Sequence, residues 1–421
     1  MPPLALETPL LTRLEAARDA SRYLATMTAA RKNAALEAIA AAITGSGDRV
    51  IAANELDLAN AADAGVSAAL QDRLRLDVGR LGNLAEAVLN VASLVDPIGE
   101  SVRGSTLPNG IAISQVRVPF GVVGVIYEAR PNVTVDIAAL ALKSGNAVVL
   151  RGGSAAQHTN RVLVDLIQHA IEGAGFPAAA VQTIDEFGRD GAKELMKARG
   201  LVDVLIPRGS ADLIAAVVAE STVPVIETGS GVVHVYLDES ADLDMAVSIV
   251  TNAKVQRPSV CNALETLLVD ASSAARLLPA VLASLQQAGV VVHGDERTRS
   301  LVAGVLPATD DDWSTEYMSL EVAVRVVDGI DDALDHIRRY STHHTEAIVT
   351  NDLARAERFL AEVDSAVVMV NASTRFTDGG EFGFGAEVGI STQKLHARGP
   401  MGLSELTSTK WIVRGTGQVR G

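Results

Sequence analysis

The sequence predicts an α/β protein in which parallel β-sheets are covered by helices on both faces. From residue 121 onward, short apolar runs such as GVVGVIY (121–127) and NAVVL (146–150) alternate with longer stretches of helical periodicity. Strands that alternate with helices form βαβ units, which build parallel sheets. The first hundred residues show mainly the helical spacing, so we expect a group of helices to precede the sheet.

The amino-terminal elements follow from leucine and alanine residues that recur at helical spacing. Thr8 and Pro9 suit a helix start, because proline fits the first helical position. Gly45 ends this pattern. Pro-Asn-Gly at 108–110 lies between alternating apolar residues, which predicts a β-hairpin near residues 100–118.

The remaining elements alternate in order along the chain. After the two strands above, we expect helices over 133–145, 156–176 and 211–221 and strands over 181–184, 202–207 and 223–227. A second unit begins near Ser240, which we interpret as the cap of a helix with Asp242 and Asp244 in its first turn. Pro258 cannot continue that helix. Further strands are expected over 263–269, 290–294, 346–350 and 366–370, and helices over 331–341 and 353–363.

Polar residues gather where the strands of the first sheet end, which is where such sheets bind ligands. They are Glu128, Arg151, Gly152, Gly153, Ser154, Arg208, Gly209, Ser210 and Glu227. Arg151 beside a helix start could hold a phosphate group. Neither a G-x-G-x-x-G nor a Walker motif is present, so an ordinary strand-to-helix turn remains the alternative for Arg151. For Glu227 the alternative is a surface carboxylate.

Cys261 is the only cysteine in 421 residues, and it follows Pro258 and precedes an apolar strand. A lone cysteine is more often buried and inert than reactive. Its position on a polar turn, between a helix and a strand, favours a chemical role instead. Both interpretations stay open on composition and position alone.

The composition narrows the class of partner. The net charge of −15 includes no compensating basic patch, which argues against nucleic acid and anionic membranes. One cysteine excludes an internal disulfide, and the start of the chain lacks the pattern of a signal peptide. The eight histidines lack the spacing of a zinc site, so no metal is expected. We expect a cytoplasmic enzyme with two or three domains.

Several long motifs then resemble one family in one order. They are YEARPNVTVD, KSGNAVVLRGGS, IPRGSADL, ETGSG, QRPSVCNALETLLV, VDGIDDALDHIRRYSTHHTEAIVTND, STRFTDGGEFGFGAEVGIST and KWIVRG. Over nearly the whole chain this order is similar to the aldehyde dehydrogenase superfamily. The segment 327–352 resembles the signature of its gamma-glutamyl phosphate reductase family.

The resemblance implies an aldehyde dehydrogenase-like architecture. It implies a Rossmann-like nucleotide-binding domain over 1–232, with the hairpin 100–118 contributing to oligomerisation. An α/β catalytic domain with Cys261 would cover 233–370, and a return segment and oligomerisation tail would cover 371–421. The hairpin and the tail would form a small β oligomerisation element, so a homo-oligomer is expected.

The resemblance also implies a reaction in proline biosynthesis. Cys261 would attack L-glutamyl 5-phosphate, and hydride transfer to the thioester would release L-glutamate 5-semialdehyde. Asn132 is a candidate second oxyanion donor, and Glu227 would lie on the nicotinamide side or assist the thiol. Arg257, Ser373 and Arg375 are candidates for the substrate, with a structural salt bridge as the alternative for either arginine.

The cofactor implied is NADP(H). Arg151, Gly152, Gly153, Ser154, Arg208, Gly209, Ser210 and Glu316 are its candidate ligands. NAD-preferring relatives often carry a glutamate where this chain has Ser154, so Arg151 could pair with a 2′-phosphate unopposed. A non-phosphorylating aldehyde dehydrogenase and an inactive nucleotide-binding protein are the alternatives. The upstream glutamate kinase is a candidate partner that the sequence leaves open.

Overall fold

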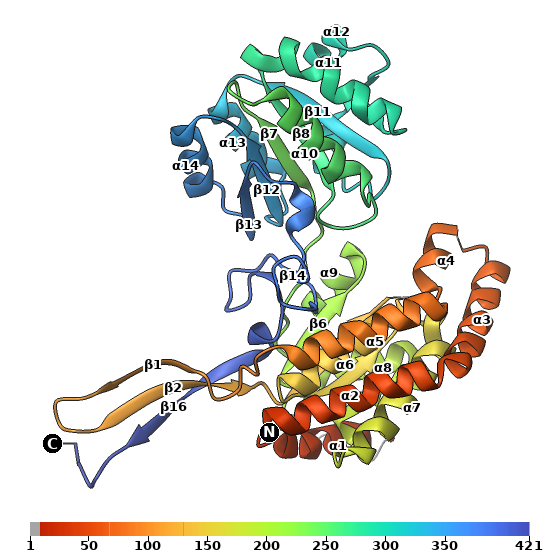
Figure 1. The fold of residues 1–421 in the computed structure, drawn as a ribbon, viewed down its shortest axis with the longest axis vertical. Coiled ribbons are helices and arrows are strands. Elements are labelled where there is room, and N and C mark those ends of the chain that lie inside the picture. Colours follow the sequence, from red (N-terminus) through yellow and green to blue (C-terminus); the bar gives the residue numbers. More distant parts are fainter. Residues whose placement is uncertain (1–8, 67, 129, 421) are drawn as a thin grey trace. The chain divides into compact units, whose positions relative to one another are not determined.

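The chain folds into two compact units, which a computed structural model describes over residues 9–66, 68–128 and 130–420 (Figure 1). Unit 1 comprises Met1–Glu227, Gly383–Gly389 and Met401–Gly421, and unit 2 comprises Thr228–Phe382 and Ile390–Pro400. The predicted segment 371–421 is therefore divided between the two units. The predicted cap at Thr8 lies outside the described residues, and the first helix begins at Pro9.

Unit 1 contains the helical beginning of the chain and a four-stranded parallel sheet of order β5-β4-β3-β6. Its helices are α1 (Pro9–Leu24), α2 (Ala29–Gly45), α3 (Gly47–Asp63), α4 (Ala68–Leu74), α5 (Val78–Ser93), α6 (Pro131–Lys143), α7 (Gln157–Gly173), α8 (Gly188–Lys197) and α9 (Ala211–Glu220). Its parallel strands are β3 (Val122–Tyr127), β4 (Ala147–Arg151), β5 (Val181–Thr183) and β6 (Val204–Arg208). All six residues of β3 are buried, as expected of a central parallel strand.

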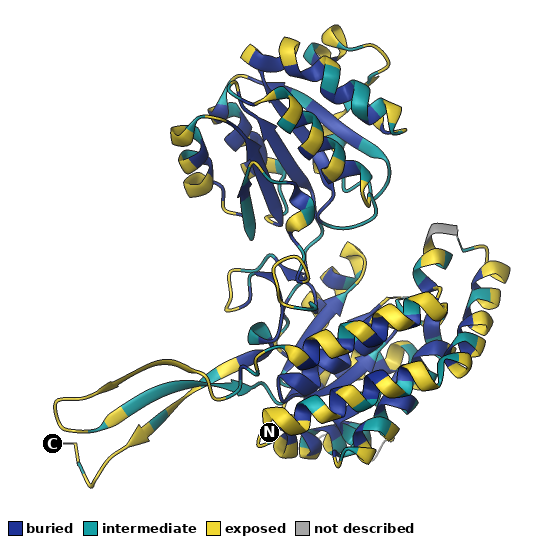
Figure 2. Ribbon diagram, in the orientation of Figure 1, coloured by how far each residue is buried: buried dark blue, intermediate teal, exposed yellow. Residues whose placement is uncertain are grey.

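Unit 2 is a seven-stranded parallel sheet of order β10-β9-β11-β8-β7-β12-β13. Its strands are β7 (Val233–Leu237), β8 (Leu264–Asp270), β9 (Val291–Gly294), β10 (Leu306–Pro307), β11 (Glu321–Val327), β12 (Thr345–Val349) and β13 (Val367–Val370). Its helices are α10 (Leu243–Val255), α11 (Ala271–Gln287), α12 (Glu296–Leu301), α13 (Ile330–Tyr340) and α14 (Leu353–Glu362). Both faces of the sheet are buried (Figure 2).

Alternation along the central strands places successive side chains of unit 2 in two different cores. In β7, Val235 and Leu237 pack with α10 and α11, whereas Tyr236 between them packs with α13 and α14. The continuous apolar runs in the sequence therefore reflect burial on both faces, as the α/β prediction requires. The fold class is confirmed.

A third, antiparallel sheet joins the predicted hairpin to the tail in the order β1-β2-β16. Its strands are β1 (Ser101–Thr106), β2 (Ala112–Pro119) and β16 (Thr407–Arg414). Every residue of β1 is exposed, and Trp411 and Val413 on β16 are exposed as well (Figure 2). A further short pair, β14 (Ile390–Ser391) and β15 (Gly399–Pro400), belongs to unit 2.

Two local predictions were wrong. The segment 223–227 is not a strand, because Pro224 has no N–H to donate and the pairing with β6 is a single bridge at Val225. Ser240 does not cap α10. Its hydroxyl donates to Asp238, 2.7 Å away, and Asp242 is the cap, accepting a bond from the amide of Met245 at 2.9 Å.

Candidate active site

The candidate nucleophile lies on a turn at the amino end of β8. Residues 256–263 connect α10 to β8, and Cys261 in this turn is partly exposed. The thiol is therefore not sealed in an apolar core, which removes the main objection to a chemical role.

The turn is bracketed by hydrogen bonds to the segment that carries Arg375. The side-chain amide of Asn262 donates to the carbonyl of Thr377 at 2.8 Å, and the hydroxyl of Thr374 donates to the carbonyl of Asn262 at 2.8 Å. Asn262 is buried, so these bonds fix the residue next to Cys261. The sequence reasoning missed Asn262, although it directly follows Cys261.

Two guanidinium groups act on the nucleophile turn. Burial lowers the pKa of Arg375, the like charge of Arg257 lowers it further, and Asp378 and Cys261 act in the opposite direction. Within the described residues, neither arginine forms an ion pair, and Arg375 donates instead to Gln256 at 2.8 Å. Ser373 accepts a bond from the amide of Arg375 at 3.3 Å and so caps the turn that presents this arginine.

A glycine is in direct contact with the backbone of Cys261. A Cβ atom on Gly231 would lie 1.5 Å from the carbonyl oxygen of Cys261, so no larger residue fits there. The amide of Gly231 donates to Oε1 of Glu316 at 2.9 Å. Burial raises the pKa of Glu316, and the bond from Gly231 and the charge of Lys254 oppose this rise. Glu316 thus contacts the nucleophile turn through Gly231.

The carboxyl edge of the sheet in unit 1 carries the candidate nucleotide ligands. The amide of Gly152 donates to Asp185 at 2.6 Å, and burial raises the pKa of Asp185 while that bond and Arg151 act against the rise. A Cβ atom on Gly152 would lie 2.2 Å from the amide nitrogen of Asn160, so the close approach requires glycine. Gly153 and Ser154 follow in a 3₁₀ turn that leads into α7. The sequence reasoning did not identify Asp185.

The neighbouring strand β6 ends in a second turn of the same kind. The amide and the hydroxyl of Ser210 both donate to Glu128, at 3.0 and 2.8 Å, and the amide of Glu128 donates to the carbonyl of Arg208 at 3.0 Å. A Cβ atom on Gly209 would lie 2.6 Å from the carboxyl carbon of Glu128. Glu128 is therefore the partner that shapes the turn 208–210.

The two remaining predicted residues also lie in unit 1. Asn132 is exposed in the first turn of α6, and its amide donates to Asp136 at 3.2 Å. Glu227 is half-buried at the end of the unit. The structure brings Cys261, Arg257 and Arg375 together in unit 2, and it brings Arg151 and Gly152 together with Asp185 in unit 1.

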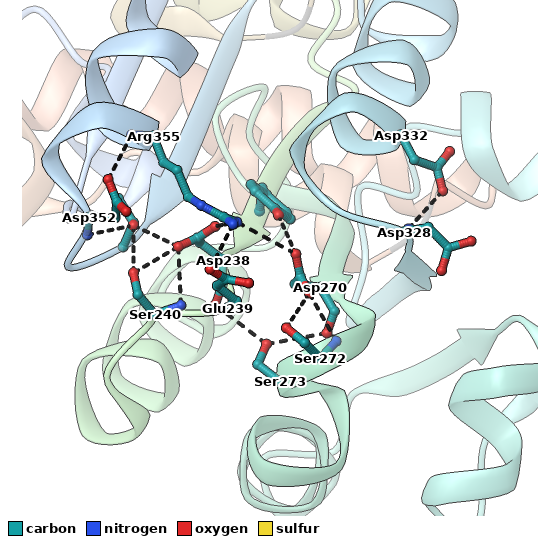
Figure 3. Close-up of polar contacts among 12 residues, drawn as sticks. Asp238, Glu239, Ser240, Asp270, Ser272, Ser273, Asp328, Asp332, Asp352 and Arg355 are labelled. Atoms are coloured by element: carbon teal, nitrogen blue, oxygen red, sulfur yellow. Dashed lines mark hydrogen bonds and ion pairs between the residues drawn. The ribbon is translucent and has the colours of Figure 1, made fainter.

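The carboxyl edge of the sheet in unit 2 carries a separate carboxylate network (Figure 3). Arg355 lies 2.7 Å from Asp238 and 2.7 Å from Glu239, and Ser240 and Thr350 donate to the other oxygen of Asp238. A cavity of about 460 Å³ opens beside this network. The charged groups that line it pair with one another, so the network serves to hold the ends of strands and helices.

Two classes of site are not found among the described residues. No group of three or more histidine, cysteine, aspartate or glutamate side chains is arranged to hold a metal ion. No helix among them combines the length and apolar character needed to cross a bilayer.

Comparison with known proteins places this geometry in a family. Residues 8–306 match the aldehyde dehydrogenase family. Gamma-glutamyl phosphate reductase of Clavibacter michiganensis subsp. michiganensis is 69% identical over 97% of this chain and 94% of its own length. The Leifsonia xyli subsp. xyli protein of the same name is 66% identical over all of both chains. The crystal structure of gamma-glutamyl phosphate reductase from Thermotoga maritima superposes with a TM-score of 0.96 at 45% identity, covering 98% of this chain and 100% of that one.

Proposed function

Because the chain belongs to the aldehyde dehydrogenase family and, within it, to the gamma-glutamyl phosphate reductases, we propose that it reduces L-glutamyl 5-phosphate to L-glutamate 5-semialdehyde and phosphate with NADPH. It is an oxidoreductase of proline biosynthesis. The observation that carries the chemical proposal is the single cysteine, partly exposed on a turn beside two arginines that form no ion pair among the described residues.

Cys261 acts as the nucleophile. Its thiolate attacks the acyl carbon, the bond from that carbon to the phosphate oxygen breaks, and phosphate leaves with the electron pair. The product of this step is a thioester on Cys261. When bound, NADPH would supply the hydride that reduces the thioester on Cys261 to a thiohemiacetal. Loss of the sulfur from that carbon releases the aldehyde and returns the thiolate.

Arg257 and Arg375 hold the anionic substrate. The positive charge near Cys261 favours the thiolate over the thiol. Their guanidinium groups suit the phosphate or the α-carboxylate, because a planar donor pair matches either oxyanion. Ser373 positions Arg375 through the turn it caps. We propose Asn132 as the second oxyanion donor, and Glu227 as a residue that lies on the nicotinamide side or assists the thiol.

The carboxyl edge of unit 1 suits a phosphorylated nucleotide. Arg151 lies where β4 ends, close to the start of α7, and the turn at 208–210 leads into α9. Helix starts and an arginine together favour phosphate groups. We assign the 2′-phosphate to Arg151, which makes NADPH the preferred cofactor. Asp185 orients the turn at Gly152 by accepting a hydrogen bond from its amide. As a carboxylate near Arg151, Asp185 is also the group that would repel a 2′-phosphate there.

We further propose how the chain divides these tasks. Residues 1–232 bind the nucleotide, and residues 233–370 carry the catalytic turn. Residues 371–421 form a return segment and the oligomerisation tail. The sheet β1-β2-β16 supports a homo-oligomer, because its exposed strands offer an edge to a second copy. We place the reaction in the cytoplasm, where the labile acyl phosphate would come from the glutamate kinase.

The reverse reaction provides the test. Wild-type protein should reduce NADP with glutamate semialdehyde only when phosphate is present, and Cys261→Ala should abolish this activity. Alkylation with iodoacetamide should inactivate the wild type completely, because Cys261 is the only thiol. Phosphate-independent formation of free glutamate would indicate a non-phosphorylating dehydrogenase. Faster turnover with NADH than with NADPH would overturn the cofactor assignment.

A further inference from the structure

Two fully buried charges frame the nucleophile turn. Lys254 lies one residue before the end of α10, and Glu265 is the second residue of β8, so the turn 256–263 runs between them. The ammonium Nζ lies 2.8 Å from Oε2 of Glu265, and both side chains are completely buried. The pair thus joins α10 to β8, the helix and the strand that flank the turn containing Cys261.

Such a pair is costly, and stability alone does not account for it. Burial lowers the pKa of Lys254 and raises the pKa of Glu265 to about 7, although each charge partly stabilises the other. Replacing a buried ion pair by apolar residues of similar volume is often neutral or stabilising. A role in positioning is therefore worth seeking in what the two side chains touch.

The side chains of Lys254 and Glu265 both lie next to the segment 316–318. The backbone of Met318 lies beside the Glu265 carboxylate and opposes the rise in its pKa. Met318 has φ +56°, a left-handed conformation that costs free energy in a residue other than glycine and persists only where its surroundings hold it. The ammonium of Lys254 lies 5.9 Å from the centre of the Tyr317 ring. Both members of the pair therefore lie beside this segment.

The same segment reaches the nucleophile. Oε1 of Glu316 accepts the amide bond of Gly231, and Gly231 packs directly on the carbonyl of Cys261. Burial raises the pKa of Glu316, and the charge of Lys254 partly opposes this rise, so Lys254 acts on Glu316 as well as on Tyr317.

We propose that Lys254 and Glu265 are positioning residues, which hold segment 316–318 so that Glu316 fixes Gly231 against the Cys261 turn. The proposal rests on the proposed function, in which Cys261 is the nucleophile and Glu316 contacts the cofactor. Neither residue of the pair touches substrate in this scheme. They act through Glu316 and Gly231.

The main experiment replaces the buried ammonium. Lys254→Met removes the charge and keeps an unbranched side chain, which is one atom shorter. It should lower kcat/KM for NADPH about 10²-fold, with a rise in the KM for NADPH, because small displacements of reacting groups have effects of this size. It should also change the rate at which iodoacetamide alkylates Cys261. The matched control is Lys32→Met, which removes another buried lysine, 2.8 Å from Asp96 in unit 1. The control should lose stability, but its kcat/KM for NADPH and its rate of Cys261 alkylation should match those of the wild type.

A double variant separates positioning from stability. Lys254→Met with Glu265→Leu leaves no buried charge, so its melting temperature should recover towards that of the wild type. If the pair positions the turn, the KM for NADPH and the alkylation rate should stay altered. The proposal would be overturned if the KM for NADPH and the alkylation rate both returned to wild-type values in the double variant. Wild-type values of both in Lys254→Met would also overturn it. Alkylation needs no turnover, so it tests positioning even if the wild type fails the phosphate-dependent assay.

Discussion

Gly231→Ala should impair catalysis by displacing the nucleophile turn. The new Cβ would lie 1.5 Å from the carbonyl oxygen of Cys261, and real contacts of this kind essentially never come closer than 3.0 Å. The two atoms must therefore separate by at least the difference, about 1.5 Å, and both belong to backbone that cannot swing aside as a flexible side chain could. A misplacement of about 1 Å can reduce an enzymatic rate about 10²-fold. We expect kcat/KM to fall by at least this factor.

The assay is phosphate-dependent reduction of NADP in the reverse direction, with iodoacetamide alkylation of Cys261 as a second measurement. Gly82→Ala in α5 is the matched control, since no described atom beyond the backbone of its own helix lies within 4 Å of the added methyl group. That variant should keep full activity and gain about 0.5–1 kcal/mol of stability. Wild-type kcat/KM in Gly231→Ala would refute the view that this contact sets the position of Cys261.

Three further predictions concern stability and assembly. Asp238→Asn should lower the free energy of unfolding by about 3 kcal/mol, measured with urea, because it removes the charge of a fully buried carboxylate that pairs with the partly exposed Arg355. Asp331→Asn at the surface should cost below about 1 kcal/mol. The pKa of Glu265 is raised to about 7 in the folded protein, so the folded state binds its proton more tightly than the unfolded state does. The protonated Glu265 therefore stabilises the fold at a pH below its pKa in the unfolded chain, and this stabilisation is lost as the pH rises through 7. The stability of the wild type relative to Glu265→Gln should therefore fall between about pH 5 and 8, and a rise would contradict the assignment. Val413→Asp on β16 should shift the sedimentation of the protein towards smaller species, and Ser408→Asp on the same strand should leave it unchanged.

The fold could be predicted because periodicity reports burial directly. In β3 and β4 every apolar residue faces one core or another, so the strands stand out in the sequence. The helix α11 was not predicted, and it contains Pro279 in its interior, which interrupts the helical signal. The segment 223–227 was predicted as a strand because it is apolar, and the sequence does not show that it pairs with β6 at Val225 alone.

The candidate site could be predicted only in part, because its residues meet through tertiary contacts. Cys261 was identifiable as the one cysteine, and Arg151 by its place after a strand. Gly231 was identifiable only as a glycine near a strand, since its contact with Cys261 joins positions thirty residues apart. Lys254 and Glu265 gave no signal, because a lysine in a helix and a glutamate in a strand are usually solvated.

Unit 2 uses buried carboxylates in two opposite ways, and the difference marks where its function lies. Burial alone would raise the pKa of Asp238, but bonds from Ser240, Arg355 and Thr350 lower it below its ordinary value. This carboxylate is therefore stabilised in its charged form and strengthens the scaffold. Glu265 and Glu316 have raised pKa values, because burial outweighs their partners. Groups held in an unfavourable environment gather at functional sites. Both such glutamates connect to the Cys261 turn, which supports the proposal that the chemistry takes place at the amino end of β8 and not in the cavity at the carboxyl edge of the same sheet.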